Sequence, residues 1–92
     1  MPALRVRRVA RQEIDAAFEW YRARSPRAAA TFLDDLAQAL TQSRAKPERY
    51  LVIHGRLRRT LLARFPYGVY FKVFPTVISV VGVIHGRQHP DA

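Results

Sequence analysis

The chain has 92 residues, 49% of them apolar, which is enough for one hydrophobic core and too short for two, so we expect a single domain over residues 1–92. Its net charge of +9 favours nucleic acid, the ribosome or an acidic protein as a partner, unless the charges are scattered over a solvated surface. The sequence has no cysteine, which excludes disulfides, thiolate catalysis and cysteine-ligated zinc.

The N-terminal residues predict a short strand followed by a helix. The first residues lack an apolar signal core, and no apolar run approaches the roughly 20 residues of a membrane span, so we expect a cytoplasmic protein without a membrane partner. Residues 4–9 alternate in polarity and predict an edge strand. From Arg11 the period becomes helical, with Glu13 and Asp15 expected in the first turn. The apolar stripe of this helix consists of Ile14, Ala17, Phe18 and Tyr21.

A second helix is predicted directly after the first. Ser25 is suited to the N-cap and Pro26 to the first helical position, so the two helices should form an antiparallel hairpin. Its expected apolar stripe consists of Ala29, Phe32, Leu33, Leu36 and Leu40, and its expected solvent side of Asp34, Asp35, Gln38, Thr41 and Gln42. Residues 46–49 should end the helix, and residues 50–53 should link it to the sheet.

The last third of the chain predicts three strands over residues 57–65, 69–74 and 77–85. The third is almost continuously apolar, which is typical of a strand covered on both faces. A type I turn over residues 65–68 and a tight connection at Pro75 and Thr76 should join them. We expect an α+β fold of order β-α-α-β-β-β, in which a helical hairpin packs on one face of a curved antiparallel sheet.

The uncovered face of this sheet should carry basic and aromatic side chains. Simple alternation assigns to it Arg58, Thr60, Leu62 and Arg64, then Tyr70, Lys72 and Phe74, then Ser79, Val81, Val83, His85 and Arg87. Such a face suits RNA, or equally an acidic amphipathic peptide, and the alternative is a solvated face without a ligand.

Two further features are candidates for function, a pair of histidines near the C-terminus and the single tryptophan. His85 and His89 flank Arg87 and could serve as acid and base in phosphodiester cleavage, although paired histidines also commonly end strands. Trp20 lies at the edge of the first helical stripe, where it should pack against the neighbouring helix or else be an exposed anchor for a partner. No metal site or cofactor is expected, since the acidic residues lie mainly on the helices.

The sequence resembles the ParE/RelE superfamily of toxins from prokaryotic toxin–antitoxin modules, which includes plasmid stabilisation proteins. Segments 16–21, 32–33, 46–50, 57–67 and 83–90 carry the resemblance, and their most specific parts are Trp20-Tyr21, Arg64-Phe-Pro-Tyr67 and His85-Gly-Arg87. The resemblance implies the fold expected above. It also implies a cognate antitoxin whose acidic, poorly folded segment wraps the toxin in a hetero-oligomeric complex.

Members of this superfamily divide by target. RelE-like toxins cut messenger RNA on the ribosome with basic groups on the sheet and a C-terminal tyrosine. Arg59 matches one such basic group. Leu61, Gly68 and Gln88 occupy positions where these toxins usually have further basic residues, and no tyrosine follows the last strand. Each missing charge typically costs about 2.7 to 4 kcal/mol in the transition state. ParE-like toxins instead bind DNA gyrase without this nuclease set.

We therefore expect a ParE-like inhibitor of gyrase and not an enzyme. One alternative is a ribosome-dependent endoribonuclease, an mRNA interferase, with a site drawn from Arg87, His85, Arg64, Arg59 and His89. Another is a non-toxic relic that only binds its antitoxin. Residues expected to contact the antitoxin or target are Trp20, Arg58, Arg64, Tyr67, Tyr70, Lys72 and Arg87.

Overall fold

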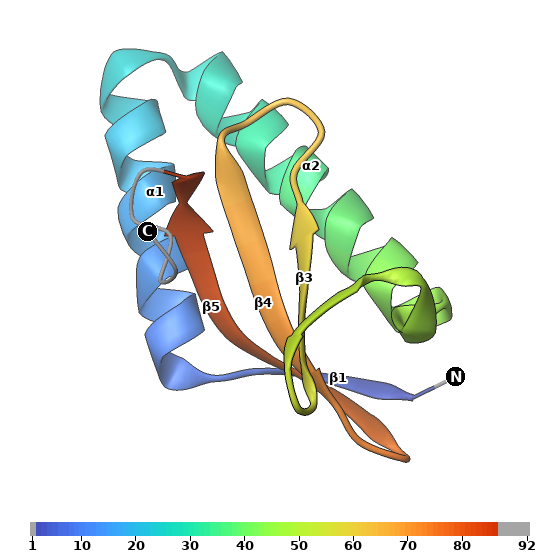
Figure 1. Ribbon diagram of the computed structural model, residues 1–92. Coiled ribbons are helices and arrows are strands. Elements are labelled where there is room, and N and C mark those ends of the chain that lie inside the picture. Colours follow the sequence, from blue (N-terminus) through green and yellow to red (C-terminus); the bar gives the residue numbers. More distant parts are fainter. Residues whose placement is uncertain (1, 87–92) are drawn as a thin grey trace.

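The computed structural model describes residues 2–86 and shows two helices packed against one face of a five-stranded sheet (Figure 1). The elements are β1 Ala3–Val6, α1 Arg8–Arg24, α2 Pro26–Ala45, the 3-10 helix η1 Pro47–Arg49, β2 Leu51–His54, β3 Leu57–Leu61, β4 Tyr67–Val73 and β5 Val77–His85. The expected α+β class and helical hairpin are confirmed. Within the described part of the chain, neither helix has the length and apolar character needed to cross a membrane.

The sheet has the strand order β1-β5-β4-β3-β2, so β1 lies at one edge and β2 at the other. Strands β3, β4 and β5 pair antiparallel, as expected, and β2 pairs antiparallel with β3. In contrast, β1 runs parallel to β5, with Ala3 opposite Val77 and Val6 opposite Val80, so the sheet is mixed and not wholly antiparallel. The link predicted over residues 50–53 is itself a strand, β2, because it pairs with β3.

The N-terminal strand is shorter and the first helix longer than the alternation predicts. β1 ends at Val6, and the N–H of Arg7 donates to the Val80 carbonyl at 2.9 Å before α1 begins at Arg8. Glu13 and Asp15 therefore lie beyond the first turn, where the helix dipole has faded. The second helix begins as expected, since the Ser25 hydroxyl accepts a hydrogen bond from the Ala28 N–H at 3.2 Å.

The core lies between the helical hairpin and the sheet. Its largest fully buried apolar side chains are Phe32, Phe71, Ile78, Val69, Val80 and Val83. On α2, two expectations are wrong: Leu33 is 39% exposed, whereas Asp35 is only 2% exposed. The helix buries the side centred on Phe32 and Leu36, and Asp35 falls on that side next to a backbone donor from the sheet layer.

The connection between β3 and β4 also differs from the prediction. β3 ends at Leu61 and β4 begins at Tyr67, so a loop over residues 62–66 replaces the expected type I turn. Leu62 turns into the core, where it is 6% exposed, and its N–H donates to the Tyr67 carbonyl at 3.0 Å. The bounds of β5 and the tight connection at Pro75 and Thr76 are as expected, the latter closed by a 2.9 Å bond from the Phe74 N–H to the Val77 carbonyl.

Candidate functional site

The strand register places Arg58 on the helix-covered face of the sheet, contrary to the sequence prediction. Arg58 lies opposite Phe71, which is completely buried beneath the helices. Its guanidinium donates to the carbonyl of Tyr50 at 2.9 Å and to that of Glu48 at 3.2 Å. Arg58 thus holds the segment before β2 against the sheet.

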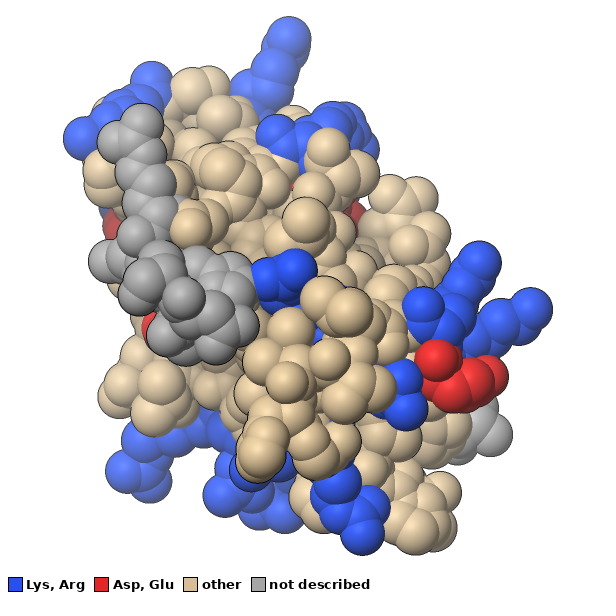
Figure 2. Space-filling view, in the orientation of Figure 1, with Lys and Arg blue, Asp and Glu red and all other residues tan. Residues whose placement is uncertain are grey.

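The open face instead carries Arg59 opposite Tyr70, with Lys72 further along β4. Near them Leu61 lies opposite Gly68 and is 64% exposed, because a glycine offers no side chain to cover it. Figure 2 shows this side of the molecule, where basic groups lie mainly around the rim and uncharged residues fill most of the middle. The predicted basic and aromatic surface is therefore built from partly different residues, and Leu61 adds an exposed apolar side chain to it.

A bulge moves His85 to the covered face. The register between β4 and β5 shifts between Tyr70 and Phe71, so Val83 lies opposite Val69 and His85 opposite Tyr67. Both partners alternate with Phe71 and face the helices. The residues predicted to share the open face on this strand are therefore divided, with Ser79 on the open face and His85 beneath the helices.

The described candidates for a nuclease centre do not converge. His85 points to the covered face and Arg59 to the open face. Arg64 lies exposed in the loop over residues 62–66. The other two candidates, Arg87 and His89, lie outside the described residues.

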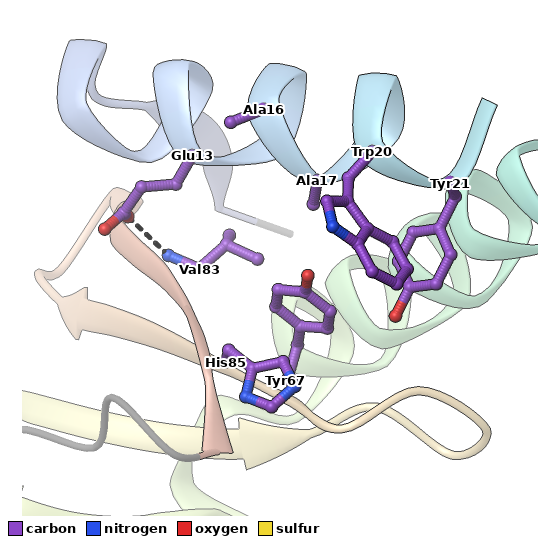
Figure 3. A pocket seen from close by; sticks show the side chains of 8 residues that line it. All are labelled: Glu13, Ala16, Ala17, Trp20, Tyr21, Tyr67, Val83 and His85. Atoms are coloured by element: carbon purple, nitrogen blue, oxygen red, sulfur yellow. Dashed lines mark hydrogen bonds between the residues drawn. The ribbon is translucent and has the colours of Figure 1, made fainter. Parts of the chain in front are cut away.

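A pocket of about 560 Å³ lies between α1 and the upper end of β5 (Figure 3). It is lined by Glu13, Ala16, Ala17, Trp20 and Tyr21 from α1, Tyr67 from β4, and Val83 and His85 from β5. The spacing of the α1 residues places them on one side of the helix. The small side chains of Ala16 and Ala17 leave room that the aromatic rings surround.

Aromatic rings form most of the pocket wall. The His85 ring meets Tyr67 edge-on at 5.2 Å between centroids, and Trp20 meets Tyr21 in the same way at 5.1 Å. Trp20 is 52% exposed and carries the Arg24 guanidinium 3.6 Å from its ring centroid, so it does not pack against α2 as the sequence favoured. Burial, and then the neighbouring Tyr21 hydroxyl, raise the pKa of Tyr67 above its ordinary value.

The polar groups of the pocket do not suit a phosphodiester. Glu13 already accepts a hydrogen bond from the backbone N–H of Val83 at 2.8 Å (Figure 3). Among the described residues that line the pocket there is no lysine or arginine, and no group of metal-binding side chains occurs within residues 2–86. The pocket is therefore best suited to an apolar or aromatic side chain of a protein partner.

Sequence reasoning named Trp20, Tyr67 and His85 as candidates, and the structure brings these three together. It missed Glu13 and assigned Tyr21 only to the core stripe. The adjacent alanines at positions 16 and 17, one turn before an aromatic pair, were the available signal for a cavity beside the helix.

Comparisons with known proteins give one consistent result. The family model described as the ParE toxin of the type II toxin–antitoxin system, parDE, matches residues 4–90. The chain is similar in structure to a protein from the chromosomal ParDE TA system of P. aeruginosa, with a TM-score of 0.79 and 19% sequence identity, covering 92% of this chain and 96% of the other. No significant match occurs among curated protein sequences.

Proposed function

Because the chain belongs to the family of ParE toxins of type II toxin–antitoxin systems, we propose that it inhibits DNA gyrase by binding and that an antitoxin holds it inactive. The toxin role follows from the family, whose model spans nearly the whole sequence. The choice of target is a separate inference, and it depends on what the open face of the sheet carries.

The cross-strand pair of Leu61 and Gly68 is the observation that favours gyrase over messenger RNA. Both positions are ones where RelE-like toxins usually carry basic groups, and here neither residue carries a charge, although the Arg59 side chain lies beside Gly68. A nuclease needs fixed charges around the scissile phosphate, because stabilisation of the developing charge supplies much of its rate. An apolar leucine that is 64% exposed instead favours contact with a protein.

The aromatic pocket supports the antitoxin as a partner. Its lining of Trp20, Tyr21 and Tyr67 offers rigid, amphipathic contact area of the kind found in binding hot spots. The net charge of +9 attracts an acidic segment, which gains burial and electrostatic attraction by ordering on this surface. We therefore propose that an apolar side chain of the antitoxin occupies the pocket in a hetero-oligomeric complex.

The decisive experiment is a supercoiling assay with purified gyrase, relaxed plasmid and the antitoxin-free chain. We expect loss of supercoiling, relieved by adding the protein encoded beside this chain. The Leu61→Lys variant should inhibit less, since it places a charge in the proposed contact. Undiminished supercoiling at high toxin excess would remove gyrase as the target.

A cell-free translation reaction provides the complementary test. Under the proposal, reporter message remains intact when mapped by primer extension. New cleavage sites that depend on translating ribosomes would establish the endoribonuclease instead. If both reactions are unaffected while the neighbouring gene product still binds, the chain is a non-toxic relic.

A further inference from the structure

Positive and negative side chains are divided between the two layers of this protein. Within residues 2–86, every acidic side chain lies on a helix, and these are Glu13, Asp15, Glu19, Asp34, Asp35 and Glu48. The described strands carry no acidic residue, whereas they carry Arg5, Arg58, Arg59 and Lys72. The sheet therefore has a positive charge that no carboxylate of its own layer compensates.

One row of residues crosses the whole open face at the end where the β2–β3 hairpin turns. The registers of the five strands place in this row, from β1 to β2, Arg5, Ser79, Lys72, Leu57 and His54, which we call the basic row. The row lies on the open face because Lys72 follows the buried Phe71 on β4. Neighbouring strands lie about 4.8 Å apart, so the Cα atoms of Arg5 and Lys72 are about 10 Å apart.

The charged members of the basic row are available to a ligand. Arg5, Lys72 and His54 are all exposed. Among the described residues, no carboxylate forms an ion pair with Arg5 or Lys72. Figure 2 shows basic groups along the lower end of this face. The row therefore offers several positive charges, held at fixed spacing by the sheet, to an anion that is long enough to meet them.

A hollow of about 450 Å³ lies at the β2 end of the basic row. It is lined by His54, Gly55, Arg56, Leu57, Lys72 and Phe74, so its charged and imidazole side chains are all basic. The Arg56 guanidinium donates to the Val73 carbonyl at 3.2 Å and lies 5.0 Å from the centroid of the Phe74 ring. These contacts orient the group but use only part of its five N–H donors. Oriented cationic donors around a hollow suit a phosphate group.

The aromatic rings of this face decide which phosphate-bearing ligand fits it. Proteins bind single-stranded nucleic acid by stacking its bases on aromatic rings. Here Tyr70 is only 3% exposed, and Arg56 lies over the ring of Phe74. Neither ring offers an open platform to a base. A row of cations without such a platform suits the sugar–phosphate backbone of a duplex, which is contacted whatever its sequence.

We propose that the basic row binds the phosphate backbone of duplex DNA, and that the toxin uses it on the DNA that gyrase holds. This inference rests on the proposed function, because gyrase is the reason that DNA is within reach. Lys72 and Gly68 are four residues apart on β4, so the row lies about 14 Å from the pair of Leu61 and Gly68. The one face would then contact the enzyme around Leu61 and the DNA along the basic row.

The first test measures binding of the antitoxin-free chain to a short labelled DNA duplex of mixed sequence, by fluorescence anisotropy at several salt concentrations. The double variant Arg5→Ala/Lys72→Ala removes two cations from the row. The control, Arg11→Ala/Arg27→Ala, removes two exposed cations from the helices and lowers the net charge equally. We expect the slope of log affinity against log salt to become shallower by about 2 for the row variant and to stay unchanged for the control.

The charge-conserving variant Arg5→Lys/Lys72→Arg should keep the slope of the wild type, since it keeps both phosphate contacts. Equal slopes for the row variant and the helix control would show that only net charge matters and would overturn the inference. So would the absence of binding by the wild type. Tighter binding of single-stranded RNA than of the duplex would also overturn it, because the ligand would then be of another kind.

The supercoiling assay tests whether gyrase inhibition uses this contact. The row variant should need at least about tenfold more toxin than the wild type for the same inhibition, and the helix control should not. Unchanged inhibition by a row variant that has lost DNA affinity would overturn the role of the row in inhibition and leave the proposed function standing. If the wild type binds DNA through the row but does not inhibit gyrase, the proposed function is wrong and the DNA site remains.

Discussion

The carboxylate of Asp35, buried in α2, accepts a hydrogen bond from the backbone N–H of Arg64 at 2.9 Å. Glu13 of α1 does the same for the N–H of Val83 on β5, at 2.8 Å. Each helix therefore sends one acidic side chain into the sheet layer to pair with a backbone donor. These two bonds fix the β3–β4 loop and the upper end of β5, the segments on which Arg64 and the aromatic pocket depend.

We expect Asp35→Ala to lower the free energy of unfolding by about 1–3 kcal/mol, because it leaves the Arg64 N–H without its acceptor in a partly buried place. Urea unfolding monitored by circular dichroism measures the change. Asp35→Asn keeps an acceptor oxygen, so it should lower the free energy of unfolding much less. The control is Asp34→Ala, an exposed neighbour on the same helix, expected within about 0.5 kcal/mol of wild type.

Replacing Glu13 by alanine should loosen the pocket more than the whole fold. The Val83 N–H loses its acceptor, so we expect its hydrogen exchange to accelerate while amides in the centre of β4 stay protected. Exchange measured by NMR on the free protein tests this. Asp15→Ala, exposed on the same helix, should leave the Val83 amide unchanged. Acceleration throughout the sheet would mean that Glu13 has a global role.

Features with a local cause could be read from the sequence. The serine cap and proline start of α2 depend only on adjacent residues, and the continuous apolar run of β5 marked its bounds correctly. The resemblance to a toxin family rested on short motifs spread over the chain, and the family match over residues 4–90 confirms it.

Features caused by distant contacts could not be read in this way. The alternation rule assumes an unbroken period of two, so the bulge beside Phe71 reversed the faces assigned to Val83 and His85. The burial of Asp35 was invisible because its partner, the Arg64 N–H, lies 29 residues away in sequence. The parallel pairing of β1 likewise depends on how the helical hairpin returns the chain.

The raised pKa of Tyr67 makes stability sensitive to alkaline pH. Since burial raises this pKa above the ordinary value of 10.0, the folded state resists ionisation more than the unfolded state does. The contribution of Tyr67 to the free energy of unfolding is fully present below this ordinary pKa, and it is lost as the pH rises through the folded-state pKa. We expect urea unfolding to show stability falling above about pH 10, and Tyr67→Phe to reduce the slope of that fall.

The comparison of slopes separates this effect from the lost contact with Tyr21. Tyr67→Phe removes the hydroxyl that interacts with Tyr21, so the free energy of unfolding of this variant should differ from that of the wild type near neutral pH by an amount that does not depend on pH. Because the other tyrosines remain in both proteins, only the difference in slope reports on Tyr67. Parallel pH profiles for the two proteins would contradict the prediction.

Trp20 should matter for binding more than for folding. Its ring is 52% exposed, so we expect Trp20→Ala to cost far less stability than Phe32→Ala, which removes a fully buried ring and should cost about 3–5 kcal/mol. Affinity for the antitoxin should fall by about 2 kcal/mol or more, roughly thirtyfold, since the tryptophan lines the proposed anchor pocket.

The matched control for Trp20 is Arg22→Ala on the same helix. Arg22 forms an exposed ion pair with Glu19 at 2.8 Å and does not line the pocket, so its loss should change neither stability nor affinity appreciably. Calorimetry with all three variants then separates the roles. We expect Phe32→Ala to lower the stability of the fold and Trp20→Ala to lower only the affinity for the antitoxin. Equal affinities of Trp20→Ala and the wild type for the antitoxin would show that the antitoxin does not bind in this pocket.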